Sequence, residues 1–298
     1  MNSAELQKAI ALLNSAQVVG MPTETVYGLA AKIDLSEAIS KIFTTKQRPD
    51  FDPLIVHVSS IDQAKNCTSY WSETAQKLAE AFWPGPLTLI LPKASHISEK
   101  ITSGLTSVGI RCPNHPLALE LIRATGPLAA PSANRFGKTS PTTKAHVDSE
   151  FENTVFTLDG GACQVGIEST VVGVFDDRLE IYRPGSITKS QLEKVGQLNV
   201  SIVQSPVSPG ALKHHYMPDI PMYLSLGNES PSELKELKFN IISLSAKPEL
   251  AARELYQLMR QACTPEVEAI LLVKRKEQVG EHWDGIWNRV SKAITKEL

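Results

Sequence analysis

The segment "TTKQRPDFDPLIVHV", residues 44–58, places two fixed positive charges directly before a proline and a short apolar run. Lys46 supplies a compact ammonium and Arg48 a planar guanidinium fork, and together they suit the oxygens of a phosphate. A basic last turn also complements the dipole of a helix, so ordinary helix capping explains the same residues equally well. The segment alone leaves both interpretations open.

A second polar segment, "APSANRFGKTSPTT" at residues 130–143, follows an apolar run of strand length. It brings Ser132, Asn134 and Ser140 close together, and Gly137 allows the backbone to approach a ligand. Small hydroxyls, an amide and loose backbone at the carboxyl end of a strand suit contacts with a phosphate or a sugar.

Four shorter segments repeat this pattern of polar residues beside apolar runs. They are "MPTETVYGLA" (21–30), "VGIRC" with Arg111, "GIEST" (166–170) and "YRPGS" with Arg183. Each alone is equally typical of a turn, a helix cap or a structural ion pair. Their distribution at successive strand ends is the one expected of a ligand crevice in an α/β protein.

Alternating helical and strand patterns predict the elements that must position these residues. Helices are expected over residues 3–15, 36–46, 72–82, 115–125 and 188–195, and strands at 18–21, 53–58, 87–91, 107–112, 127–131, 154–159, 169–175, 179–183 and 198–203. We expect an α/β domain with a twisted, mixed or parallel open sheet flanked by helices.

The pattern of alternating helices and strands stops after residue 203. The segment "QSPVSPGALKHHYMPDIP", residues 204–221, has four prolines and little apolar periodicity, which is typical of a linker. Beyond it, strand patterns at 222–226, 239–245 and 268–273 alternate with helices at 248–262 and 285–298. We therefore predict a large domain (1–203), a linker (204–221) and a small α/β, Rossmann-like domain (222–298).

Composition narrows the functional classes. The net charge of −2 gives no global signal for nucleic acid, so any anion site must be local. No apolar run reaches the ~18 residues of a membrane span, and the N-terminus has the pattern of an amphipathic helix, so we expect a cytoplasmic protein. The four cysteines and the adjacent pair His214-His215 have poor spacing for a metal site, and none is predicted. P-loop and dinucleotide fingerprints are absent.

Taken in order, these segments resemble the YrdC-like threonylcarbamoyl-AMP synthase family. The matching blocks are "PTETVYGL", "IFTTKQRPDFDPLIVHV", "WPGPLTLIL", "GIRCPNHPLA", "AAPSANRFGKTSPT", "DGGACQVGIESTVV" and "YRPGSIT". The linker "SPGALKHHYMPDIP" and the tail are similar to those of the longer, two-domain members. The linker departs from the usual pattern at residues 211–214, and the tail is shorter than usual.

The resemblance implies a reaction in which L-threonine, bicarbonate and ATP give threonylcarbamoyl-AMP and pyrophosphate. Other proteins then use the product to modify adenosine 37 of certain tRNAs. Magnesium is expected as a cofactor that bridges the ATP phosphates. No side-chain nucleophile is required, because the carbamate itself attacks phosphorus and the protein positions the reactants.

The resemblance also implies roles for individual residues. Lys46 and Arg48 would be catalytic and would hold the triphosphate. The other expected ATP-binding residues are Asp52, Ser107, Ser132, Asn134, Ser140, Arg183, His214 and Tyr216. Arg111 would pair with the carboxylate of threonine, and Thr25, His57, Ala130 and Ser169 would frame the amino acid. The linker around Tyr216 would close over the site as a lid.

Two rival functions remain at this point. The first is a factor that binds double-stranded RNA or tRNA without adenylation activity, which the near-neutral charge disfavours. The second is a carbamoyl-adenylate step in metallocentre maturation. The proteins of that pathway carry acylphosphatase-like and zinc-finger segments, which this sequence does not contain.

Overall fold

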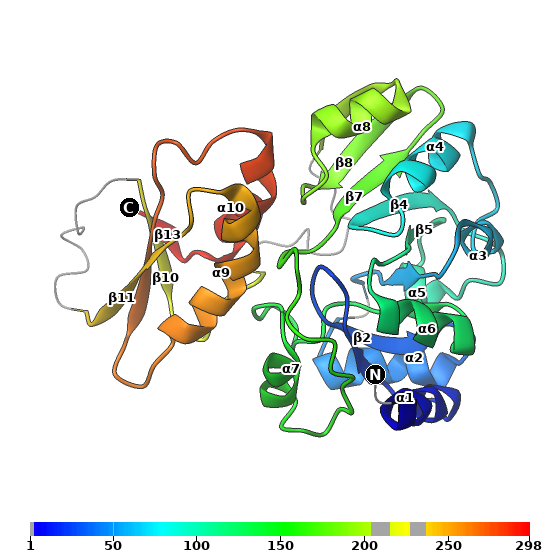
Figure 1. The fold of residues 1–298 in the computed structure, drawn as a ribbon, viewed down its shortest axis with the longest axis horizontal. Helices are drawn as coiled ribbons and strands as arrows, with labels where there is room; N and C mark the ends of the chain where they lie inside the picture. Colours follow the sequence, from blue (N-terminus) through cyan, green and yellow to red (C-terminus); the bar gives the residue numbers. More distant parts are fainter. Residues whose placement is uncertain (1–2, 50, 204–214, 227–236) are drawn as a thin grey trace.

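Helices and strands alternate along the chain, and the strands form two separate sheets. This arrangement confirms the predicted α/β class. The computed structural model describes residues 3–49, 51–203, 215–226 and 237–298. Figure 1 shows two lobes, a larger one built on the first sheet and a smaller one built on the second. Among the described residues, no helix is long and apolar enough to cross a membrane.

The larger sheet has nine strands and mixed directions. In spatial order they are β1 (Val19–Met21), β2 (Gly28–Lys32), β6 (Leu128–Ala129), β3 (Ile55–His57), β5 (Ser107–Arg111), β4 (Leu87–Pro92), β7 (Thr170–Val174), β8 (Arg178–Arg183) and β9 (Asn199–Ile202). The pairs β3–β5, β4–β7 and β8–β9 are parallel, and the other neighbours are antiparallel.

Eight helices of the described chain accompany this sheet. They are α1 (Ser3–Asn14), α2 (Ser36–Lys46), α3 (Ile61–Asn66), α4 (Glu73–Phe82), α5 (Glu99–Thr102), α6 (Pro116–Thr125), α7 (Lys144–Glu150) and α8 (Lys189–Gly196). The apolar faces of α2, α4 and α8 share one core with the central strands, while α1 and α6 pack together in a second core at the β1–β2 end.

Successive side chains of the central strands point to opposite faces of the sheet, and one face packs against helices while the other is available to a ligand. Val56, Val108 and Ile110 point into the core beneath the helices. Their neighbours point the opposite way, so His57 and Arg111 lie on the other face. These two residues are direct partners in the parallel β3–β5 register.

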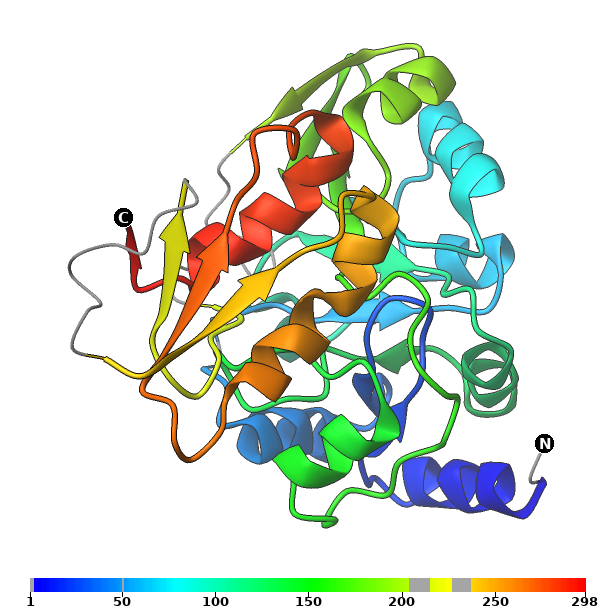
Figure 2. The same ribbon diagram turned by 60° about the vertical axis from the view of Figure 1, so that its left-hand side comes forward.

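The smaller sheet is entirely parallel. Its order is β11 (Phe239–Ser243), β12 (Ala269–Val273), β10 (Met222–Ser225) and β13 (Lys296–Glu297). Helices α9 (Pro248–Ala262) and α10 (Glu281–Ala293) lie on the side of this sheet that faces the larger lobe (Figure 1). Figure 2 shows α9 beside the segment that carries α7, where Arg260 forms an ion pair with Glu150.

Two local expectations were wrong. Residues 154–159 form no strand, and Thr157 makes only an isolated bridge to Gly20. The last helix ends at Ala293 rather than Leu298, because the chain turns to add β13 to the small sheet. The domain boundaries stay a prediction, since residues 204–214 of the expected linker lie outside the described residues.

Candidate functional site

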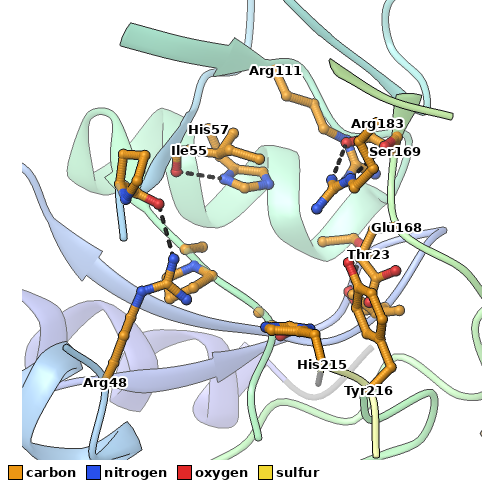
Figure 3. Close-up of a pocket in the computed structure, with 16 residues that line it drawn as sticks. Thr23, Arg48, Ile55, His57, Arg111, Glu168, Ser169, Arg183, His215 and Tyr216 are labelled. Carbon is orange, nitrogen blue, oxygen red and sulfur yellow. Dashed lines mark hydrogen bonds between the residues drawn. The ribbon is translucent and has the colours of Figure 1, made fainter. Parts of the chain in front are cut away.

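A cavity lies on the ligand face of the large sheet, where β3 and β5 end. Figure 3 shows Arg48 on one side of it and Arg111 and Arg183 on the other, with His57 between them. The full lining comprises Thr23, Val26, Gly28, Arg48, Pro53, Ile55, His57, Arg111, Ala130, Pro131, Ser132, Glu168, Ser169, Arg183, His215 and Tyr216. Three buried guanidinium groups in one small cavity favour an anionic ligand.

The C-terminus of α2 separates the two predicted phosphate ligands. Gln47 adopts the left-handed conformation (φ 52°), and the Arg48 amide closes the turn on the Phe43 carbonyl at 2.9 Å. Pro49 then prevents the helix from continuing. The left-handed turn sends Lys46 and Arg48 in different directions.

Lys46 ties the two polar segments together instead of lining the cavity. It is buried, and its ammonium donates to the backbone carbonyls of Ser132 and Asn134. Burial, with the Arg48 charge nearby, lowers the pKa of Lys46 well below its usual range. The contact holds the segment that begins at Ser132 against the end of α2.

Arg48 does face the cavity, and its guanidinium is fixed by the turn that follows. Nη2 lies 2.8 Å from a carboxylate oxygen of Asp52 and donates to the Pro53 carbonyl at 2.9 Å. Nε donates to the Asp52 carbonyl at 3.1 Å. Asp52 therefore acts as the counterion of Arg48, and it does not line the cavity itself.

Arg111 has a similar internal counterion. Its Nη2 lies 2.7 Å from Glu24, and its Nε donates to the Gly85 carbonyl at 3.3 Å. Beside it, burial and the Arg111 charge lower the pKa of His57 to about 3. The imidazole of His57 is therefore neutral at physiological pH, and it forms an uncharged wall between two arginines.

Arg183 and Ser169 form a pair on the wall opposite Arg48 (Figure 3). Arg183 donates from Nε to the Ser169 carbonyl and from Nη2 to the Ser169 hydroxyl, both at 3.1 Å. The same hydroxyl lies 2.7 Å from that of Thr88. The end of β8 and the start of β7 are thereby locked together at the cavity.

The cavity gathers eight of the fifteen residues expected from the sequence. They are Arg48, His57, Arg111, Ala130, Ser132, Ser169, Arg183 and Tyr216. Five more of the expected residues do not line the cavity and are buried next to residues that do: Thr25, Lys46, Asp52, Asn134 and Ser140. Asn134, for example, donates to the carbonyls of Arg135 and Lys138. Ser107 lines a neighbouring depression with Ile55 and Tyr182. His214 lies outside the described residues.

Three polar lining residues were missed. Thr23 lies at the cavity, whereas Thr25 turns inward and its hydroxyl lies 2.9 Å from that of Thr23. His215 lines the cavity, although the sequence-based prediction chose His214 of this histidine pair. Glu168 stands inside the quoted segment "GIEST", and an acidic residue among hydroxyls was the signal that could have identified it.

The acidic side chains of this region do not fit a metal cage. Glu24 pairs with Arg111, Asp52 with Arg48 and Glu168 with Arg289. The described part of the chain contains no cluster of three metal-ligating side chains. A magnesium ion at this site would have to be held through phosphate oxygens of the ligand.

Comparisons with known proteins support this picture over both lobes. Residues 11–185 match the Sua5/YciO/YrdC family model, which bears the description telomere recombination. Residues 187–294 match the model of the threonylcarbamoyl-AMP synthase C-terminal domain.

Individual relatives agree. The threonylcarbamoyl-AMP synthase of Bacillus subtilis is 44% identical over 79% of this chain and 70% of its own length. That of Pyrococcus abyssi is 39% identical over 72% of this chain and 66% of its own length. The crystal structure of P. abyssi Sua5 complexed with L-threonine superposes with a TM-score of 0.88 at 33% identity, and covers 98% of this chain and 95% of that one.

The fold and the cavity define a two-domain α/β protein with a buried, arginine-rich site for a small anionic ligand. The chain belongs to the YrdC-like threonylcarbamoyl-AMP synthase family, in its two-domain form.

Proposed function

We propose that this protein is an L-threonylcarbamoyladenylate synthase that makes threonylcarbamoyl-AMP and pyrophosphate from L-threonine, bicarbonate and ATP. The observation that carries the proposal is the convergence of Arg48, Arg111 and Arg183 on one cavity in a chain of this family. The reaction brings an amino acid, which carries a free carboxylate, together with a triphosphate substrate, so it requires separate cationic sites for two anionic groups.

In the proposed reaction the amine of threonine first combines with bicarbonate and loses water to give a carbamate. A carbamate oxygen attacks the α-phosphorus of ATP, the bond between the α-phosphorus and its bridging oxygen breaks, and pyrophosphate leaves. Arg48 and Arg183 would bind phosphate oxygens, and Arg111 would bind the carboxylate of threonine. The similar P. abyssi Sua5, solved in complex with L-threonine, supports threonine as a substrate. Charge stabilisation and positioning then supply the catalysis.

Tyr216 is the proposed lid residue. The cavity measures about 50 Å³ as it stands, which is room for a few water molecules and far less than ATP needs. Tyr216 lines it in the left-handed conformation (φ 64°), and its ring packs against His215 at 4.2 Å between centroids. Entry of the nucleotide would therefore require this segment to move, and its return would exclude water.

The remaining expectations become proposals of the same kind. Magnesium would accompany ATP, and tRNA-modifying proteins would receive the adenylate and transfer its threonylcarbamoyl group to adenosine 37. A cytoplasmic location stays an expectation. Weak tRNA binding during delivery of the product is a further expectation.

A direct experiment tests the proposal. The protein is incubated with ATP, magnesium, bicarbonate and each amino acid in turn, and the adenylate is identified by its mass. Threonine-dependent release of pyrophosphate with formation of threonylcarbamoyl-AMP is expected. Salt-sensitive tRNA binding without any adenylate would instead favour the RNA-binding alternative.

A further inference from the structure

Glu168 lies in the wall of the site, but residues of the other domain hold its carboxylate. Its side chain is 8% exposed, and it lines the cavity beside Ser169. From α10, Arg289 donates through Nε to Oε2 at 2.8 Å and through Nη2 to the Glu168 backbone carbonyl at 3.0 Å. From α9, the Tyr256 hydroxyl lies 3.0 and 3.2 Å from the two carboxylate oxygens.

The contact extends into the large domain on both sides of Glu168. The Ser140 hydroxyl donates to Oε1 at 2.5 Å, and Arg289 also donates to the Pro184 carbonyl next to Arg183. Arg289 itself is completely buried. One guanidinium of the small domain thus joins the start of β7 to the end of β8, which are the two segments that supply Ser169 and Arg183.

The contacts and charges around Glu168 disfavour a role as a general base. Burial alone would raise the pKa of Glu168, but the charges of Arg289 and Arg183 and the hydrogen bond from Ser140 lower it to about 2. A carboxylate this acidic accepts a proton poorly at neutral pH. Three donors also fix its rotamer, so its contribution must lie in the geometry that it imposes on its neighbours.

The two domains meet closely enough to enforce this geometry. A Cβ added to Gly166 would lie 2.4 Å from the Arg253 Cα, so the backbone of α9 rests directly on the loop before Glu168. A Cβ added to Gly285 would lie 3.0 Å from the Gly185 Cα, which places α10 on the loop after Arg183. Backbone contacts of this kind leave little freedom for sliding.

We infer that Arg289 and Tyr256 are positioning residues, through which the small domain fixes Glu168 and thereby sets Ser169 and Arg183 for catalysis by the large domain. The inference rests on the proposed synthase function and extends it by giving the small domain a task in the reaction. The alternative is an interface that only adds stability.

The test uses the full chain and substitutions that keep most of the packing. Tyr256→Phe removes one hydroxyl, and Arg289→Lys keeps the charge but loses the fork that spans Glu168 and Pro184. The matched control is Arg253→Lys on α9, because Arg253 donates across the same interface to the Gln164 carbonyl at 2.8 Å without touching Glu168. Threonine-dependent pyrophosphate release gives kcat and KM, and denaturant unfolding gives stability.

Tyr256→Phe and Arg289→Lys should each lower kcat roughly 10- to 100-fold at temperatures where the protein is folded, as small displacements of catalytic groups do. Arg253→Lys should leave kcat unchanged. In a Glu168→Gln background, the effect of Tyr256→Phe should shrink, because both residues act through the same carboxylate. Normal kcat in both variants, or full additivity with Glu168→Gln, would overturn the inference.

A readout without turnover separates this inference from the proposed function. Amide hydrogen exchange of the peptide that spans residues 166–170 should accelerate in Arg289→Lys and not in Arg253→Lys. If the unmodified protein releases no pyrophosphate, the synthase proposal fails by itself. If it does, and the peptide exchanges equally in both variants, the positioning role fails alone.

Discussion

The ammonium of Lys46 donates to the backbone carbonyl of Ser132, which lies 86 residues further along the chain. This contact joins the end of α2 to the loop after β6, so the two polar segments that stood out in the sequence share one support. Lys46 is buried, whereas Arg48, two residues later, lines the cavity. The Lys-x-Arg pattern therefore divides two tasks between two basic side chains.

Lys46→Ala should abolish pyrophosphate release and also lower the free energy of unfolding. Each carbonyl left without a donor costs about 1–3 kcal/mol. The control is Lys138→Ala in the same loop, where the lost partner is the exposed Asp219 at 2.8 Å. A surface pair of this kind is worth less than about 1 kcal/mol. Turnover assays and urea denaturation compare the two, and a fully active Lys46→Ala would contradict the assignment.

Arg48→Met should remove activity and leave the buried carboxylate of Asp52 without its counterion. Breaking one partner of a buried pair costs about 3–5 kcal/mol. The double variant Arg48→Met/Asp52→Asn removes both charges, so it should recover most of the stability and none of the turnover. Recovery of turnover in the double variant would show that Arg48 only neutralises Asp52.

Arg111→Ala should remove about 2–3 kcal/mol of binding free energy for threonine, which raises the KM for threonine roughly 30- to 160-fold. The KM for ATP should change little. Because the substitution also leaves Glu24 unpaired, Arg111→Ala/Glu24→Gln is the companion variant. Both should show the same selective loss in steady-state kinetics with threonine varied. An unchanged threonine KM would move the carboxylate site elsewhere.

How much of this site was predictable from sequence depends on the distance over which each contact acts. The alternating apolar pattern predicted β3 and β5, and their shared carboxyl edge brought His57 and Arg111 together as expected. The place of Glu168 at the site could have been inferred from its segment, but its ion pair could not, because its partner Arg289 is 121 residues away in another domain.

Local geometry set the other limits. The left-handed Gln47 sends Lys46 toward backbone carbonyls, and no residue pattern indicates which way a lysine points after such a turn. The apolar residues at 154–159 pack as a loop against β1 because only Thr157 finds a strand partner there. The β-propensity of a segment can be read from its residues, whereas strand pairing also requires a neighbouring strand with an unpaired edge.

Acid should destabilise the protein through its buried histidines. Burial lowers the pKa of His57 and of His215 to about 3, below the ordinary value of 6.5 that the unfolded chain shows. Between these values the unfolded state binds more protons, so stability is complete above about pH 6.5 and falls as the pH drops toward 3. His57→Gln should reduce the dependence of the free energy of unfolding on pH by about 1.4 kcal/mol per pH unit in this range. Unfolding curves at pH 7, 6, 5 and 4 measure it, and an unchanged slope would contradict the burial.

Gly166→Ala should weaken the contact between the domains. Gly166 has φ +85°, and an added Cβ would meet the backbone of α9. Gly161→Ala is a matched control, since φ is +76° there and nothing lies within 4 Å of the added atom. The control should cost only the strain of the left-handed region, about 1–2 kcal/mol. Equal destabilisation of the two variants in denaturant would show that α9 does not press on Gly166.

Arg48 and Arg111 each carry a counterion within the protein, Asp52 for Arg48 and Glu24 for Arg111. A ligand therefore exchanges partners with a carboxylate rather than neutralising bare charge. Free sulfate or phosphate gains little from such an exchange, since it offers charge without the contacts of the rest of the substrate. Affinity should then depend on the shape of the whole ligand and vary only weakly with ionic strength, so that the abundant small anions of a cell do not compete for the site.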